Sequence, residues 1–287
     1  MKQLNEIDVS HFKSLIYLLD DEDDSIYSIA KEHLLLAGER ALPVLERYLQ
    51  ADDSLMQHRI REIYEIISLS TFKEQLRSFC EKHKSVDIDL EEGAFLIAKQ
   101  AYPNVDMHIY SDLLNFFAAE FQSRLDPSDS PEEIATKIGN YFSHEKGFSG
   151  NEADYYNTDN HYINKVIETK RGVPITLSIV YMLVLRRLNF PVQGIGMPGH
   201  FIVRYEFGTS FLFADPFHGG NILSLEDCKK SLVKLGYPFK NEYLEPVTNR
   251  QILERMLRNL VLVFEKQNQS VKMQALLQCI DILNRNV

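Results

Sequence analysis

The second half of the chain carries a histidine and an aspartate whose chemistry suits a base and its orienting partner. His200 follows Gly199 in the segment GMPGHFIVRY, and Asp215 begins the segment DPFHGG. An imidazole takes and returns protons near neutral pH, and a carboxylate hydrogen-bonded to the ring fixes its orientation. If the two side chains meet, they predict a pair of the kind that activates a nucleophile.

The hairpin between His200 and Asp215 decides whether these side chains meet. A two-residue turn at Phe207 and Gly208 would place them directly opposite each other, with Cβ atoms about 5 Å apart. A four-residue loop that ends at Ser210 would shift the pairing by two and keep both on one face, whereas a three-residue loop would separate them. The sequence leaves these registers open. Without a functional site, the same pair would only stiffen a hairpin.

A nucleophile for this pair is harder to find. A cysteine at a helix N-terminus has a lowered pKa and amides that stabilise an oxyanion, yet residues 171–220 contain no cysteine. The helix predicted here begins at Pro174, because proline suits a position where no N–H is needed. Ser178 shares the face of Pro174 about 6 Å along the axis, whereas Thr176 points away from that face. Ser178 is the better of two poor candidates, since a hydroxyl has a much higher pKa than a thiol.

Other polar residues of this half have both functional and structural interpretations. His218 could join His200 and Asp215 in a metal site of two histidines and one carboxylate, but the loose spacing argues against a metal, and we expect no cofactor. Asn160 and Asn164 lie four residues apart at a predicted helix start, a pattern more typical of capping than of substrate contact.

The elements that position these residues follow a long polar loop at 147–160. Apolar periodicity predicts a buried helix from Pro174 to about Asn189. Before the loop, residues 89–124 are predicted to be helical, and a further helix runs from about Pro131 to Phe142. Alternating side chains predict three strands, at 192–195, 200–206 and 211–215.

Both ends of the chain are predicted to be helical. Asp23-Asp24-Ser25-Ile26 recurs as Asp52-Asp53-Ser54-Leu55, each time before an amphipathic helix. Between the copies, Gly38 is predicted to end one helix and Pro43 to lie in the first turn of the next. Short HEAT-type hairpins and an ordinary helical bundle both fit this pattern. At the other end, apolar spacing predicts helices at about 251–267 and 271–283, which fit one tetratricopeptide-like hairpin that packs on the core or on a partner.

Composition excludes several classes of function. The chain has 31 Lys and Arg against 41 Asp and Glu, a net charge of −10, which repels nucleic acids and anionic membranes. We find no signal peptide and no apolar run of bilayer length, and therefore expect a cytoplasmic protein that binds neither nucleic acid nor membrane. The three cysteines, Cys80, Cys228 and Cys279, are too widely spaced for a zinc knuckle and are expected to be buried thiols.

Five segments together resemble the transglutaminase-like superfamily, and within it the bacterial branch with a tetratricopeptide-type tail. They are GFSGN (147–151), YYNTDNHYINKVI (155–167), RGVPITLS (171–178), GMPGHFIVRY (196–205) and DPFHGG (215–220). The resemblance covers roughly Leu90 to the C-terminus and implies a papain-like core. His200 and Asp215 match the general base and its orienting partner. The family's cysteine has no match, because Gly172-Val173 is followed by Pro174.

We therefore predict an α+β protein in three parts. They are a helical, HEAT-like region at 1–88, a transglutaminase-like core with a small antiparallel sheet at 89–246, and a tetratricopeptide-like helical hairpin at 247–287.

The predicted function follows from the missing cysteine. We expect a non-catalytic module that binds a protein or peptide in a groove around His200 and Asp215. The alternative is a peptidase, amidase or acyltransferase that uses Ser178 with the same pair. The candidate ligand-binding residues are Asn160, Asn164, Pro174, Thr176, Gly199 and His218.

Overall fold

The computed structural model describes residues 6–49, 54–84, 87–208 and 210–285. The chain forms two compact units, Met1–Ser78 and Phe79–Val287, and each is described by itself. The boundaries proposed from the sequence at 88 and 246 stay predictions.

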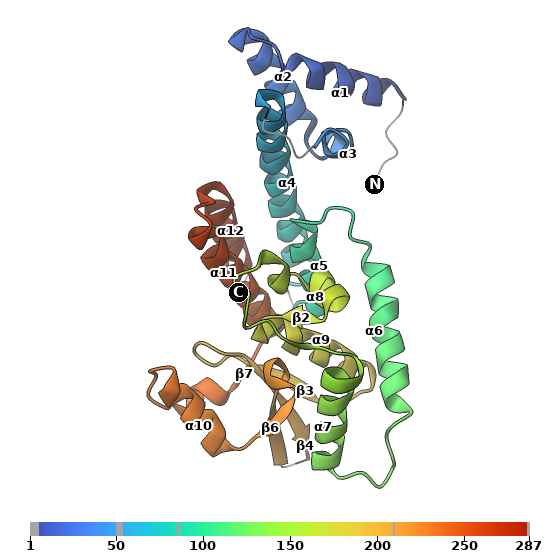
Figure 1. The fold of residues 1–287 in the computed structure, drawn as a ribbon, viewed down its shortest axis with the longest axis vertical. Helices are drawn as coiled ribbons and strands as arrows, with labels where there is room; N and C mark the ends of the chain where they lie inside the picture. The colour runs from blue at the N-terminus through green and yellow to red at the C-terminus, as the bar shows by residue number, and fades with distance from the viewer. Residues whose placement is uncertain (1–5, 50–53, 85–86, 209, 286–287) are drawn as a thin grey trace. The chain divides into compact units, whose positions relative to one another are not determined.

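The first unit is helical (Figure 1). Its helices are α1 (Glu6–Leu18), α2 (Asp24–Ala37), α3 (Leu42–Glu46) and the first part of α4 (Leu55–Lys82). As predicted, Asp23 caps α2, Gly38 ends it with a φ of 59°, and Pro43 lies in the first turn of α3. Asp52 and Asp53 of the second copy lie outside the described residues, so the HEAT-type repeat stays a prediction. The core of this unit includes Phe12, Ile16, Leu34, Leu45, Ile60 and Ile63.

The second unit combines helices with a small sheet, which confirms the predicted α+β class. Its helices are α5 (Leu90–Lys99), α6 (Met107–Gln122), α7 (Pro131–Asn140), α8 (Ile163–Thr169), α9 (Pro174–Arg187), α10 (Leu225–Lys234), α11 (Asn249–Lys266) and α12 (Ser270–Asn284). Polar N-caps explain several starts, among them Asp89 before α5 and Ser130 before α7. A π-helical turn, Tyr141–Glu145, continues α7, and a 3₁₀ turn, Thr158–His161, precedes α8.

The sheet is antiparallel, with strand order β6-β5-β4-β3-β7. Its strands are β3 (Val192–Ile195), β4 (Ile202–Phe207), β5 (Ser210–Asp215), β6 (Asn221–Leu223) and β7 (Pro246–Val247). A separate parallel pair joins β1 (Ser149–Gly150) to β2 (Arg171–Gly172). This pair ties the long loop at 147–160 to the segment that leads into α9.

The register of the hairpin excludes a turn at Phe207 and Gly208. Phe207 pairs with Ser210, so the pairing is shifted by two from that of a turn at Phe207 and Gly208, and matches the register of the longer loop. The predicted strand at 200–206 also begins later, at Ile202. His200 lies in the turn before β4, because Gly199 has a φ of 70° and the His200 amide donates to the Met197 carbonyl oxygen at 3.2 Å.

Helix α9 is the centre of the second unit. Every residue from Pro174 to Leu185 is buried, and the helix packs against α6, α8, β3 and β4. The predicted helix start at Pro174 is confirmed. Helices α11 and α12 lie side by side, and α11 also packs against α5 and α9 (Figure 1). Asn268, with a φ of 57°, lies between them where the break was predicted. The tetratricopeptide type of this hairpin stays a prediction.

No helix within the described ranges is long and apolar enough to cross a bilayer.

Candidate functional site

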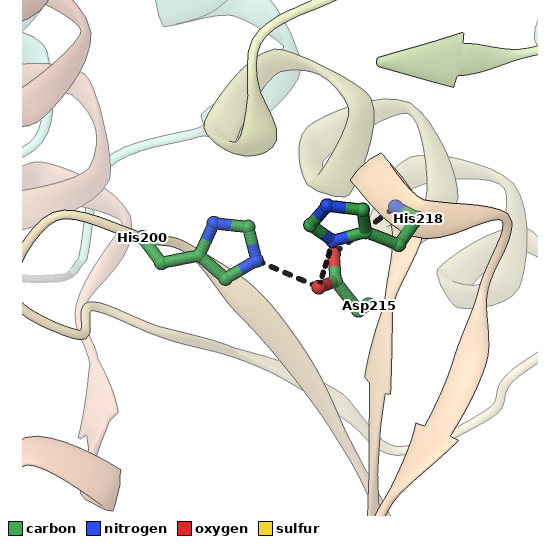
Figure 2. A group of neighbouring side chains, drawn as sticks. All are labelled: His200, Asp215 and His218. Carbon is green, nitrogen blue, oxygen red and sulfur yellow. Dashed lines mark hydrogen bonds and ion pairs between the residues drawn. The ribbon is translucent and has the colours of Figure 1, made fainter. Parts of the chain in front are cut away.

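Two histidines and one aspartate converge at the end of β5 (Figure 2). His200 Nε2 and His218 Nδ1 each lie 2.7 Å from the same oxygen, Oδ2 of Asp215. The side chain of Asp215 is 7% exposed, that of His200 13%, and that of His218 53%. The histidine and aspartate singled out from the sequence are therefore in direct contact, and His218 is a second, more exposed partner of the carboxylate.

The other oxygen of Asp215 is held by the backbone. Asp215 is the last residue of β5 and caps the 3₁₀ turn Pro216–His218, and its Oδ1 accepts hydrogen bonds from the amides of Phe217 at 3.0 Å and His218 at 3.3 Å. Burial raises the pKa of Asp215, but the hydrogen bonds and charges of the two histidines outweigh this, so the pKa lies below its ordinary value. The carboxylate is therefore ionised at neutral pH and fixed at both oxygens.

The loop that carries His200 is fixed from α11. Arg255 Nη2 donates a hydrogen bond of 2.8 Å to the carbonyl oxygen of His200. Because Nε2 faces Asp215, the second ring nitrogen of His200 lies on the side away from the carboxylate (Figure 2). This nitrogen is the one that remains to act on a ligand.

A cavity of about 370 Å³ lies beside His200. Pro174, the first residue of α9, lines it, and so do Gly199 and His200. Three of the residues named from the sequence therefore meet at one cavity. The residue at the start of the helix is the one that offers neither a nucleophile nor an amide N–H.

Neither of the two candidate hydroxyls, those of Ser178 and Thr176, forms a hydrogen bond with the imidazole of His200. Ser178 is fully buried, and its Oγ donates to the carbonyl oxygen of Phe201 at 3.5 Å. Thr176 Oγ1 donates to the carbonyl oxygen of Asn160 at 2.7 Å and accepts from the Val173 amide at 3.2 Å. Thr176 therefore fixes the start of α9 from inside the protein, on the side predicted for it.

The two asparagines are interior residues and do not line the cavity. Asn160 Nδ2 donates to the carbonyl oxygen of Asp154 at 2.6 Å, and its Oδ1 accepts from Asn151 at 3.0 Å. These bonds fold the long loop on itself, and the backbone carbonyl of Asn160, which accepts from Thr176, ties the loop to α9. Asn164 lies within α8, is 1% exposed, and leaves its Oδ1 without a hydrogen-bond partner.

Sequence reasoning missed several polar residues of the cavity, and His161 and Arg255 are the two that can carry a charge near neutral pH or below. His161 is 3% exposed, and neither of its ring nitrogens has a hydrogen-bond partner. Burial lowers the pKa of His161 to about 4, against a slight opposing effect of the Tyr155 backbone, so its ring is neutral at pH 7. Arg255 comes from α11, far along the chain. His161 could have been proposed from the sequence, because it lies inside the segment YYNTDNHYINKVI that carries part of the family resemblance.

The remaining walls of the cavity are mostly aromatic and aliphatic. They are contributed by Tyr155, Tyr156, Ile175, Phe201, Tyr237, Asn259, Leu262 and Val263.

The group of His200, Asp215 and His218 has the donor types of a metal site. Ligand atoms of the three lie within 4.8 Å of one another. One nitrogen of each imidazole lies at hydrogen-bond distance from the same carboxylate oxygen. In this arrangement the aspartate orients both rings. The same donors could hold a divalent cation if the rings turned their lone pairs toward a common point.

All three cysteines are buried free thiols, as expected from their spacing. Burial raises the pKa of Cys228 to about 11, and the charges of Asp227 and Asp215 add to this effect. A thiol of this kind is protonated and unreactive at neutral pH.

The model of the transglutaminase-like superfamily matches residues 109–258. This range contains His200, Asp215, Pro174 and all the walls of the cavity except Asn259, Leu262 and Val263.

Related sequences come from bacteria and animals. The UPF0162 protein of Xylella fastidiosa (strain 9a5c) is 34% identical over 188 residues, which cover 63% of this chain and 66% of that protein. The UPF0162 protein of Vibrio cholerae is 28% identical over 59% of this chain and 64% of its own length. F-box only protein 21 of Homo sapiens is 27% identical over 47% of this chain and 22% of its own length. The chain thus spans just under two thirds of the length of these two UPF0162 proteins. No solved structure matches it significantly.

Proposed function

Because this chain belongs to the transglutaminase-like superfamily, we propose that it is a member without a nucleophilic cysteine and that it binds a protein or peptide in the cavity beside His200. The observation that carries this proposal is the position of Pro174. It is the first residue of α9 and lines the same cavity as His200, where a nucleophile would have to stand to be activated. A base and an orienting carboxylate without a nucleophilic side chain cannot form the acyl-enzyme on which a cysteine-type hydrolase depends.

The rival function, a hydrolase or acyltransferase that uses Ser178, has less support. A serine nucleophile must give its proton to a base within hydrogen-bond reach and must meet its substrate. Ser178 is fully buried and bonded to the Phe201 carbonyl oxygen, and it does not line the cavity. The three cysteines offer no replacement, since all are buried.

A polypeptide ligand suits the walls of the cavity. Aromatic rings and aliphatic side chains contribute apolar surface for a side chain, while Arg255, Asn259 and His161 supply polar contacts. Helix α11, the first helix of the terminal hairpin, forms one wall, so we propose that a tetratricopeptide-like tail contributes to binding in this protein. A cytoplasmic location and a regulatory role belong to the same proposal.

The Pro174→Cys variant tests the assignment of this position. A thiol at the start of α9 beside His200 should have a lowered pKa, so we expect alkylation by iodoacetamide at pH 6 at least about tenfold faster than in the control. The control is Leu225→Cys, at the first position of α10, which is 49% exposed. Adding His200→Ala to Pro174→Cys should remove most of the gain.

The wild-type protein is tested in parallel with a serine-directed fluorophosphonate. We expect no labelling. Labelling that disappears in Ser178→Ala would contradict the proposal and establish the rival. Equal alkylation of Pro174→Cys and Leu225→Cys would mean that position 174 is not the nucleophile position.

A further inference from the structure

The residues that line the cavity beside His200 include basic side chains but no acidic ones. The chain carries a net charge of −10, yet no aspartate or glutamate is among the residues that line the cavity. Its ionisable lining residues are Arg255, His161, His200 and the tyrosines. A cavity that excludes acidic side chains from an acidic protein is suited to a negatively charged ligand.

Arg255 is the main charge of this cavity and lacks an acidic partner. Within the described part of the chain, no carboxylate forms an ion pair with it, and its guanidinium donates to the His200 carbonyl oxygen while lying 5.6 Å from the ring centre of Phe201. Burial lowers the pKa of Arg255. On the next turn of α11, by contrast, Arg258 is bonded to Glu254 at 2.8 Å through Nε. A partly buried guanidinium with free donors is stabilised by a carboxylate.

Two further features favour an anion at the same place. Thr176 Oγ1 accepts from the amide of the N-cap residue Val173, but Val173 has no side-chain oxygen to accept from the first amides of α9, and Pro174 and Ile175 bring this positive end of the 14-residue helix to the cavity. His161 is 3% exposed at the cavity; the Tyr155 backbone is near its ring, but neither ring nitrogen makes a hydrogen bond of good geometry. A buried polar group without a partner is destabilising unless a ligand or water satisfies it.

A second cationic side chain, that of Lys266, lies beside a residue of the cavity wall. Lys266 Nζ lies 3.3 Å from the ring centre of Tyr156, a half-exposed residue that lines the cavity.

From these contacts we infer that the cavity binds a carboxylate carried by a peptide, with Arg255 as its cationic contact and the aromatic walls around the neighbouring apolar side chain. This inference rests on the proposed binding function and names the chemistry of the ligand. The carboxylate can belong to the C-terminus of a peptide or to the side chain of an aspartate or glutamate.

The experiment uses fluorescence polarisation with labelled random hexapeptide pools. One pool has a free C-terminal carboxylate and no acidic residue, a second is the same pool amidated at the C-terminus, and a third is amidated but contains one aspartate or glutamate. We expect the second pool to bind at least about tenfold more weakly than the first or the third. Preference for the first pool assigns a C-terminal carboxylate, and preference for the third assigns an acidic side chain.

Variants of α11 complete the test. Arg255→Gln should weaken the preferred pool by at least about tenfold and leave the neutral amidated pool unchanged, whereas Arg258→Gln, outside the cavity, should change neither. Leu262→Trp places a larger side chain at a half-exposed lining residue, so it should weaken the binding of all three pools by filling part of the cavity. Circular dichroism of each variant checks that it is folded.

The outcomes separate this inference from the proposed function. Binding that is blocked by Leu262→Trp but is indifferent to amidation, to acidic residues or to Arg255→Gln would overturn the carboxylate and leave peptide binding intact. No binding of any pool to the wild-type protein would overturn both.

Discussion

His200 Nε2 lies 2.7 Å from Oδ2 of Asp215, and the same oxygen lies 2.7 Å from His218. The carboxylate thus holds the ring of a buried histidine while its other oxygen accepts two backbone amides. An ionised group with this many donors around it stabilises the fold as well as orienting the site. Its removal should therefore be measurable without any assay of activity.

Asp215→Asn should lower the free energy of unfolding by about 1–3 kcal/mol at pH 7. The pKa of Asp215 in the folded protein lies below the ordinary 3.8, so its contribution is fully present above pH 3.8 and is lost as the pH falls through the folded-state pKa. The difference between wild type and variant should shrink at pH 3. Urea unfolding followed by circular dichroism at both pH values measures it, with the exposed Glu226→Gln as control. An unchanged difference at pH 3 would argue against a role for the charge.

His161 should make the protein less stable in mild acid. Its pKa is about 4 in the folded protein against 6.5 ordinarily, so both states are neutral above pH 6.5, and only the unfolded state gains a proton as the pH falls toward 4. At pH 5 this difference corresponds to about 2 kcal/mol of lost stability. His161→Phe should abolish this loss between pH 7 and pH 5, whereas His108→Ala, at an exposed position, should keep it. Because the chain has no tryptophan, circular dichroism is the suitable signal.

Gly220→Ala should destabilise the segment that follows Asp215. Gly220 has a φ of 75°, and a Cβ there would lie 2.6 Å from Gly139 Cα and 2.8 Å from Tyr181 Oη. We expect a loss of about 2–4 kcal/mol, because both the backbone conformation and the contact are unfavourable. Gly236→Ala is the matched control, since Gly236 has a φ of 84° but nothing within 4 Å, and it should lose about 1 kcal/mol. Equal losses in thermal unfolding would mean that the contact with α7 is unimportant.

Ser178→Ala should have little effect on either stability or peptide binding. Its hydroxyl makes one long hydrogen bond of 3.5 Å, so we expect a change within about 1 kcal/mol, and peptide affinity within about twofold of wild type. Chemical denaturation and the polarisation assay measure the two quantities. A loss of peptide affinity without a loss of stability would show that Ser178 contributes to binding.

The parts of the fold that local signals specify were predicted well. Pro174 and the apolar run after it predicted the start of α9 and, within two residues, its end at Arg187. Both signals are local, because a helix start and a buried helix face depend on residues close together in the sequence. Asp23, Gly38 and Pro43 likewise marked the ends of helices in the first unit. The start of β4 was placed two residues early, since the alternation at 200–206 does not reveal the turn that Gly199 makes.

The cavity was not predictable in the same way. His200 and Asp215 are close in sequence, so a register argument could bring them together. Arg255 lies on an amphipathic helix at the far end of the chain, and its sequence pattern gives only a helix with one apolar face. Its place beside His200, and that of His161, depend on how α11 packs against α9 and the 3₁₀ turn, which single-sequence periodicity does not contain.

The packing of α11 has a consequence for dissecting this protein. The family match ends at residue 258, inside α11, whereas the cavity wall continues through Asn259 and Leu262 to Val263. A fragment cut at the family boundary would keep His200, Asp215 and Arg255 but would lose the residues of α11 that complete the cavity wall. Helix α11 therefore belongs to the cavity as well as to the terminal hairpin, and a chimera that exchanged the hairpin would also exchange one side of the cavity.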